Sequence, residues 1–149
     1  MAILELGILF MQEVLLETQY YTTNHKIDKN LRLSLLHSLD SVTSEAFGEE
    51  LSGFSLGEFT ILMAKKAVSE PNNQAHKESL ILYSIIDKET NEKVVKQNME
   101  IALNQFLDIY SLHDIFNKKT KKFKDFDERL KKIFKDLILK NEDRFKSLF

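Results

Sequence analysis

The spacing of apolar residues changes period several times along this chain, and the order of those changes limits the folds it can adopt. Strand-like alternation fills residues 3–10 and 14–21, and helical spacing follows over residues 28–47. Three more strand-like runs lie within residues 49–86, and the remaining third is helical. A period of two indicates strands and a period of 3.6 indicates amphipathic helices. The predicted order is therefore strand-strand-helix-strand-strand-strand-helix-helix.

The opening strand is predicted to be central because both of its faces are apolar. Alternate residues from Leu4 to Phe10 share one face and those from Ile3 to Leu9 share the other. Such a strand is covered on both sides. Gly7 lacks a side chain, which predicts a close approach there by a crossing helix. Met11–Glu13 form a short connection to the second strand, Val14–Tyr21, so a hairpin opens the protein.

The middle of the chain predicts one helix and three strands. Asp28 is placed to cap the helix, which carries Leu31, Leu35, Leu39 and Val42 at helical spacing and ends at Gly48. Glu49–Val68 contains two strands separated by Leu56–Glu58. Ser69–Lys77, with the only proline, is predicted to be a mobile polar loop. Leu80–Ile86 is apolar enough for an interior strand.

The C-terminal third predicts two helices joined by a basic connection, Asn117–Lys124. Thr90 or Asn91 caps the first helix, and its apolar positions are Val94, Val95, Met99, Ala102, Phe106 and Ile109. A second apolar side indicates burial on more than one flank: Ile101, Leu103, Leu107 and Tyr110. The last helix repeats Phe126, Leu130, Ile133 and Leu137 at four-three-four spacing.

These elements predict a single α+β domain over residues 1–140, followed by a tail at residues 141–149. The simplest architecture is a five-stranded, antiparallel-rich sheet with the first helix on one face and the last two on the other. The tail carries Phe145, Leu148 and Phe149, which either fold back on the core or dock on another chain.

Composition excludes several classes of protein. The chain has 149 residues, 43% of them hydrophobic, which is enough for a core and argues against a disordered regulator. Zero cysteines exclude disulfides and cysteine-ligated zinc. The apolar start carries Glu5 and lacks a basic leader, so it is interpreted as a strand and not as a signal peptide. No apolar run approaches the roughly 18 residues of a membrane span. We expect a cytoplasmic protein with at most peripheral membrane contact.

Charge is unevenly distributed. The last 39 residues hold 12 basic and 7 acidic side chains, whereas the whole chain has a net charge of −2. One run is strongly basic: Lys118, Lys119, Lys121, Lys122 and Lys124. Two interpretations remain open, a solvated connection between helices and a site for anionic lipid or an acidic partner, with Lys118, Lys119, Lys121 and Lys122 in contact. Nucleic acid is not expected as a partner, because few aromatic residues interrupt the lysines.

Candidates for chemistry are few. The four histidines, His25, His37, His76 and His113, lack the spacing of metal ligands. Gly53 and Gly57 resemble a phosphate loop only superficially, because no lysine-serine or lysine-threonine pair follows them. We therefore expect no catalytic residue, no metal, no cofactor and no enzymatic activity.

The pattern resembles the longin domain, which is found at the start of certain SNARE proteins and, in longin-like form, in TRAPP subunits, adaptor small chains and regulators of small GTPases. Five segments carry the resemblance: Leu6–Phe10, Phe47–Leu51, Ile85–Lys88, Phe106–Tyr110 and Phe123–Leu137. No SNARE coiled coil or membrane anchor follows, so the resemblance does not imply membrane fusion. It implies a scaffold or a GTPase-regulating, vesicle-trafficking type of subunit, of the stand-alone kind that also occurs in archaea.

A non-enzymatic protein-interaction module is therefore the expected function, with a small GTPase or another longin- or roadblock-type subunit as partner in a homo- or heterodimer. By the resemblance, an apolar segment docks between the first helix and the third strand, at Leu33, Leu36, His37, Phe54 and Leu56. The other interpretation is that these residues complete packing within the chain. The alternative function is a PAS- or profilin-like domain that senses a small ligand, for which the sequence offers only Ser84, Thr60 and Thr18 as inward polar groups.

Overall fold

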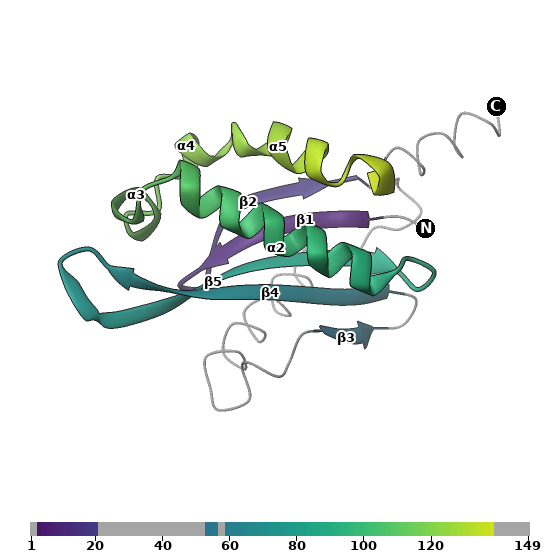
Figure 1. Cartoon of the computed structure of the whole chain (residues 1–149), viewed down its shortest axis with the longest axis horizontal. Helices are drawn as coiled ribbons and strands as arrows, with labels where there is room; N and C mark the ends of the chain where they lie inside the picture. The colour runs from purple at the N-terminus through teal and green to yellow at the C-terminus, as the bar shows by residue number, and fades with distance from the viewer. Residues whose placement is uncertain (1–2, 21–52, 57–58, 139–149) are drawn as a thin grey trace.

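The computed structural model describes residues 3–20, 53–56 and 59–138, which form an antiparallel sheet with helices packed on one face (Figure 1). The α+β class and the antiparallel pairing are thus confirmed. The strand order is β2-β1-β5-β4-β3. The strands are β1 (Ile3–Phe10), β2 (Glu13–Gln19), β3 (Gly53–Leu56), β4 (Phe59–Glu70) and β5 (Asn73–Asp87). The predicted helix capped by Asp28 lies outside the described residues, as does the tail.

The central position predicted for the opening strand is confirmed. β1 pairs with β2 on one side and with β5 on the other. Every residue of β1 is buried, and Ile8 has no exposed surface. Apolar residues on both faces of a strand are what a covered, interior position requires.

The β1–β2 turn is shorter than predicted. Met11 and Gln12 alone form it, with φ of 49° and 66°, and Glu13 already belongs to β2. Two successive residues with positive φ match the turn that fits the right-handed twist of a two-residue hairpin. β2 also ends earlier than predicted, at Gln19 instead of Tyr21.

Gly7 makes room for an aromatic ring and not for the crossing helix that the sequence predicted. Its cross-strand partner is Tyr83 on β5, and a Cβ built on Gly7 would overlap that ring at Cε1, Cζ and Oη. The expectation was wrong because a missing side chain signals a close approach without saying what approaches.

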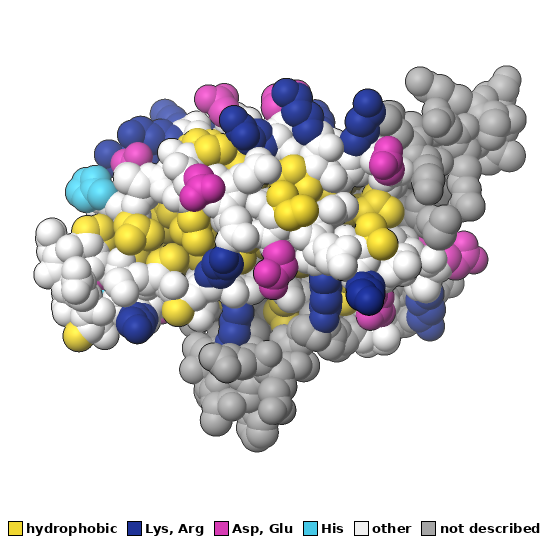
Figure 2. All heavy atoms as spheres, in the orientation of Figure 1, with side chains coloured by type: hydrophobic (Ala, Val, Ile, Leu, Met, Phe, Trp, Pro, Cys, Tyr) yellow, Lys and Arg dark blue, Asp and Glu magenta, His cyan; other side chains and the backbone are white. Residues whose placement is uncertain are grey.

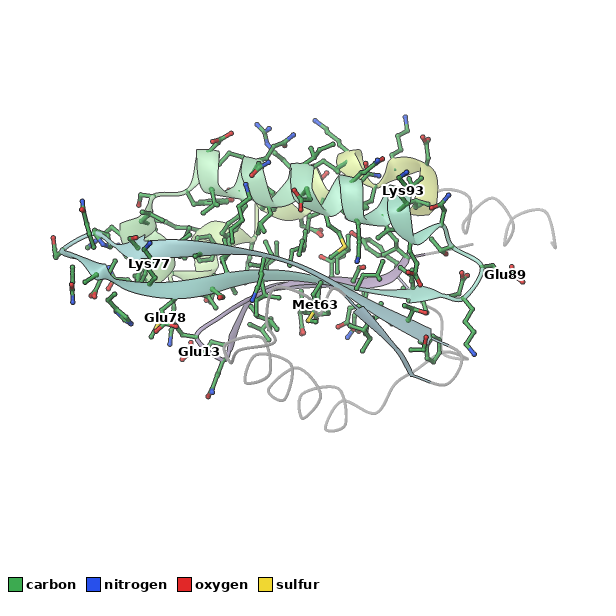
Figure 3. All side chains as sticks on the ribbon, turned by 60° about the horizontal axis from the view of Figure 1, so that its bottom comes forward. Glu13, Met63, Lys77, Glu78, Glu89 and Lys93 are labelled. Atoms are coloured by element: carbon green, nitrogen blue, oxygen red, sulfur yellow. The ribbon has the colours of Figure 1, made fainter. Side chains whose placement is uncertain are left out.

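The predicted polar loop at Ser69–Lys77 is also wrong, because β4 and β5 continue through it. They pair from Phe59 with Asp87 to Glu70 with Asn73, leaving Pro71 and Asn72 as the turn. Proline fits the second position of such a turn because its φ is already fixed near −65°. β1 reaches only to Leu80 on β5, so residues 67–79 extend beyond it as a two-stranded ribbon, here called the arm (Figure 3).

Four helices follow the sheet: α2 (Glu92–Ile109), α3 (Leu112–Phe116), α4 (Thr120–Phe123) and α5 (Phe126–Ile133). The predicted cap is confirmed, since the Asn91 side chain accepts hydrogen bonds from the backbone N–H groups of Lys93 and Val94. The predicted basic connection, Asn117–Lys124, contains the short helix α4, and another short helix, α3, precedes it. Of the apolar positions predicted for the last helix, Phe126, Leu130 and Ile133 lie in α5, and Leu137 lies in a further helical turn at residues 135–138.

Aromatic rings fill the space between the helices and the sheet. The Phe106 ring lies with its centroid 5.2 Å from those of both Phe123 and Phe126, and Tyr110 lies 4.9 Å from Phe123. Phe106, Phe123 and Phe126 are almost fully buried. The Phe106–Phe126 and Tyr110–Phe123 pairs are edge-to-face, an arrangement that adds to the stabilisation that burial provides. They fix α4 and α5 against α2.

Candidate interaction surfaces

The predicted docking groove is only partly within the described residues. Leu33, Leu36 and His37 lie outside them. Phe54 and Leu56 are in β3, where they pair with Ile61 and Phe59. β3 is the last strand of the sheet on that side, which agrees with the edge position that the prediction required.

A second apolar surface, which the sequence did not predict, runs along α2. Val94, Ile101 and Ile109 are exposed by 40%, 48% and 44% of their surface. Ile101 and Ile109 follow Val94 by seven and fifteen residues, which correspond to about two and four helical turns. The three side chains therefore share one flank of the helix. Figure 2 shows hydrophobic side chains on the face of the molecule that α2 crosses. We call these three residues the apolar stripe.

The exposure of these three side chains shows that the prediction of core positions for them was wrong. The sheet buries a different flank of α2, formed by Val95, Met99, Ala102, Leu103 and Phe106. Of the four large hydrophobic residues that the described part of the chain exposes, three belong to the stripe, and the fourth is Met11 in the β1–β2 turn. Isolated exposed apolar residues are ordinary, but three on one helix flank indicate a contact surface.

The predicted lysine run is divided between paired and unpaired side chains. Lys118 Nζ lies 3.0 Å from Glu13 Oε1, and Asp114 accepts from Lys122 at 3.1 Å and lies 3.5 Å from Lys119. The ammonium of Lys122 holds the pKa of the Asp114 carboxyl below its usual value. Three of the four lysines predicted to meet an anionic surface therefore have carboxylate partners, and only Lys121 has none among the described residues.

A buried polar group lies on the sheet face that is turned away from α2. Glu5 has no exposed surface, and its Oε2 accepts a 2.6 Å hydrogen bond from the hydroxyl of Tyr83. Gln19 Nε2 donates to the other oxygen at 3.2 Å. A buried carboxylate is tolerated when its oxygens are hydrogen-bonded. The alternation of residues along β1 predicted which face carries Glu5. It could not predict that Tyr83, whose ring occupies the space beside Gly7, would be its hydrogen-bond partner.

The arm carries a histidine held between two carboxylates. His76 Nδ1 lies 3.0 Å from Glu70 Oε2, and Nε2 lies 2.7 Å from Glu78 Oε1. The imidazole ring also lies 6.3 Å from the ring of Phe116 on α3, in an edge-to-face arrangement. The carboxylates contact opposite ring nitrogens, so they cannot bind one metal ion together with the imidazole. The ring N–H groups donate hydrogen bonds to Glu70 and Glu78, and these bonds, that to Glu70 first, raise the pKa of His76 above its usual value of 6.5.

Stability should therefore depend on pH through His76. A group whose pKa is raised by folding stabilises the folded state below its unfolded pKa and loses that effect as pH rises through the folded value. We expect the difference in melting temperature between the parent and His76→Gln to be largest below about pH 6.5 and to shrink at higher pH. Thermal unfolding over that range tests this. A difference that is independent of pH would show that the two carboxylates do not hold a charged imidazole.

Two of the three hydroxyls proposed for a ligand-sensing domain, those of Ser84 and Thr18, form hydrogen bonds to neighbouring elements. Ser84 Oγ donates to Met99 Sδ at 3.3 Å, and Thr18 donates to Asp127 on α5. Tyr20, two residues after Thr18, has a buried hydroxyl with no hydrogen-bond partner among the described residues, and burial raises its pKa. Since Ser84 and Thr18 bond to neighbouring elements, neither is available to orient a small ligand.

The described residues provide neither a cluster of metal ligands nor a membrane-spanning helix. They contain no group of three or more His, Asp or Glu side chains that could hold a metal ion. None of the helices placed by the structure is both long enough and apolar enough to cross a bilayer. No known family model matches the sequence, and no curated protein matches it. The surfaces of the molecule are therefore the guide to its function.

Proposed function

We propose that this chain is a non-enzymatic interaction module of longin-like type, a subunit that binds a second protein through α2. The apolar stripe carries the proposal. Its three side chains are exposed by 40% or more, although they sit on the helix that supplies five buried residues to the core. Burying them against a partner would remove apolar surface from water without unfolding the domain.

The arrangement of the described elements supports the longin-like part of the proposal. Two strands, then three strands, then helices follow one another in the order expected from the resemblance. All described helices lie on one face of the sheet. The other face of the sheet carries a separate buried cluster that contains Leu4, Ile61 and Tyr83.

The proposed partner is a second subunit, either another copy of this chain or a related longin- or roadblock-type chain, in an assembly that serves a small GTPase or vesicle trafficking. Polar side chains flank the stripe: Asn98, Gln105 and Asp108. A small apolar centre with a polar border is the usual composition of an interface between proteins that also exist apart. The stripe thus fits a dimer contact better than a core position.

Ile101→Glu tests the proposal. Light scattering of the purified chain should give the mass of a dimer for the parent and of a monomer for Ile101→Glu, because a carboxylate would have to be desolvated in the contact. Both chains should melt at nearly the same temperature, since exposed positions change stability by about 0.5 kcal/mol or less. A parent chain that is monomeric alone should instead form a mixed dimer with a longin- or roadblock-type subunit.

Asn104→Asp is the matched control. It adds the same charge to the same helix, one turn along, and it keeps the oxygen that accepts from Lys66. The control should retain the dimer. Loss of the dimer in both variants would assign the effect to net charge, and retention in both would place the interface elsewhere.

A further inference from the structure

The outer surface of α4, α5 and the turn after α5 is basic, and the proposed protein contact does not involve it. Phe123, Phe126, Leu130 and Phe134 face the core and are fully or almost fully buried. Most of the residues between them are exposed, whereas Asp127 and Ile133 are partly buried. Lysines without an acidic partner among the described residues recur along this surface, here called the basic ridge: Lys121, Lys124, Lys132 and Lys135. Figure 2 shows Lys and Arg side chains along this edge of the molecule.

The neighbouring charges reduce the positive potential of the ridge without cancelling it. Lys131 is held by Asp127 at 3.4 Å and by Glu128 at 4.0 Å. Asp125 at the N-cap of α5 and Glu128 on the helix are exposed acidic side chains, and Asp136 follows in the next turn. Arg129 donates to Gln105 on α2 at 3.4 Å. Four lysines on this surface are thus without an acidic partner in the described part of the chain and could meet an external anion.

We propose that the basic ridge is a docking surface for an anionic lipid bilayer. Unlike an arginine, a lysine does not need a fixed bidentate geometry, so it can bind headgroups in many positions. Each lysine near an anionic leaflet strengthens binding about fivefold. A row of exposed lysines on a helix surface suits such a broad, mobile array of charges. Membrane contact would be peripheral and electrostatic, because the phenylalanines and leucine of these helices are committed to the core.

Two other anionic partners fit the ridge less well. Protein interfaces are depleted of lysine and favour arginine, but the only arginine on α5 donates to Gln105. Single-stranded nucleic acid requires exposed rings on which bases stack, whereas Phe123 and Phe126 are buried. The experiment below also measures binding to each of these two kinds of partner.

The test is flotation of the full chain with vesicles of phosphatidylcholine alone or with about a third phosphatidylserine. At low salt the parent should float with the anionic vesicles only, and binding should fall as the screening length shortens from about 30 Å to about 8 Å. A chain with Lys121, Lys124, Lys132 and Lys135 changed to Gln should bind at least tenfold more weakly. Unchanged far-ultraviolet circular dichroism and melting temperature would confirm that this variant is folded.

A matched control changes four other lysines to Gln: Lys77, Lys88, Lys93 and Lys96. It alters net charge equally but leaves the ridge intact, so it should retain binding within about threefold, which is less than the effect of one lysine at the leaflet. Equal loss in both variants would overturn the proposal, as would binding to neutral vesicles. Binding of the parent to RNA or to polyglutamate without binding to anionic vesicles would also overturn it.

Discussion

Ile8→Asp is expected to prevent stable folding. Ile8 lies in the middle of β1, with Leu16 of β2 on one side and Leu82 of β5 on the other, and it has no exposed surface. An aspartate there would place a carboxylate among apolar side chains, which costs several kcal/mol even when the group takes up a proton. Domains of this size are stable by only about 5–15 kcal/mol. The variant should be insoluble or show no cooperative thermal transition.

Ile8→Val is the matched control, because it keeps the site apolar and removes one methylene group. It should lower the free energy of unfolding by about 1 kcal/mol, measured by urea denaturation. A soluble Ile8→Asp chain that melts within a few degrees of the parent would contradict the interior position of β1 and with it the order of the sheet.

The core strands and the long helix could be predicted from the sequence because burial leaves a periodic signal. β1 is apolar on both faces, and α2 follows Asn91, a residue type that can cap a helix. Neither signal depends on distant parts of the chain.

The arm could not be predicted, because its cover comes from a distant element. Between Lys66 and Leu80, Val68 is the only large aliphatic side chain, so this stretch has the composition of a loop. In the structure Val68 is buried and α3 packs against β4. Contact with residues more than forty positions away supports a strand that local pattern alone does not indicate.

The surfaces were the least predictable part, since periodicity shows which residues are apolar without showing which flank meets the sheet. α2 has apolar residues on several sides, and only the packed structure separates Val95 and Met99 from the stripe. For the lysine run, the density of charge was evident in the sequence. The carboxylates that neutralise part of it, Glu13 and Asp114, are known only from the fold.

Gly7→Ala is expected to destabilise the domain by about 3 kcal/mol, although it adds a single methyl group. That methyl would occupy the position of the Tyr83 ring on the neighbouring strand. The ring cannot turn aside at little cost, because it is fully buried and its hydroxyl donates to Glu5 at 2.6 Å. Relief would require the loss of this hydrogen bond or a separation of β1 from β5. Urea denaturation should show a lower midpoint for Gly7→Ala.

A double-mutant cycle with Tyr83→Leu distinguishes this clash from the ordinary effect of alanine in place of glycine. Tyr83→Leu alone should destabilise, since it removes the ring and leaves Glu5 with fewer hydrogen bonds. Once the ring is gone, the methyl of Gly7→Ala has space, so the second change should cost less than about 1 kcal/mol. The two effects should therefore fall short of additivity by about 2 kcal/mol, within the range found for residues in contact. Strict additivity would mean that Gly7 and Tyr83 do not share this space, and the reason for a glycine in an interior strand would lie in another contact.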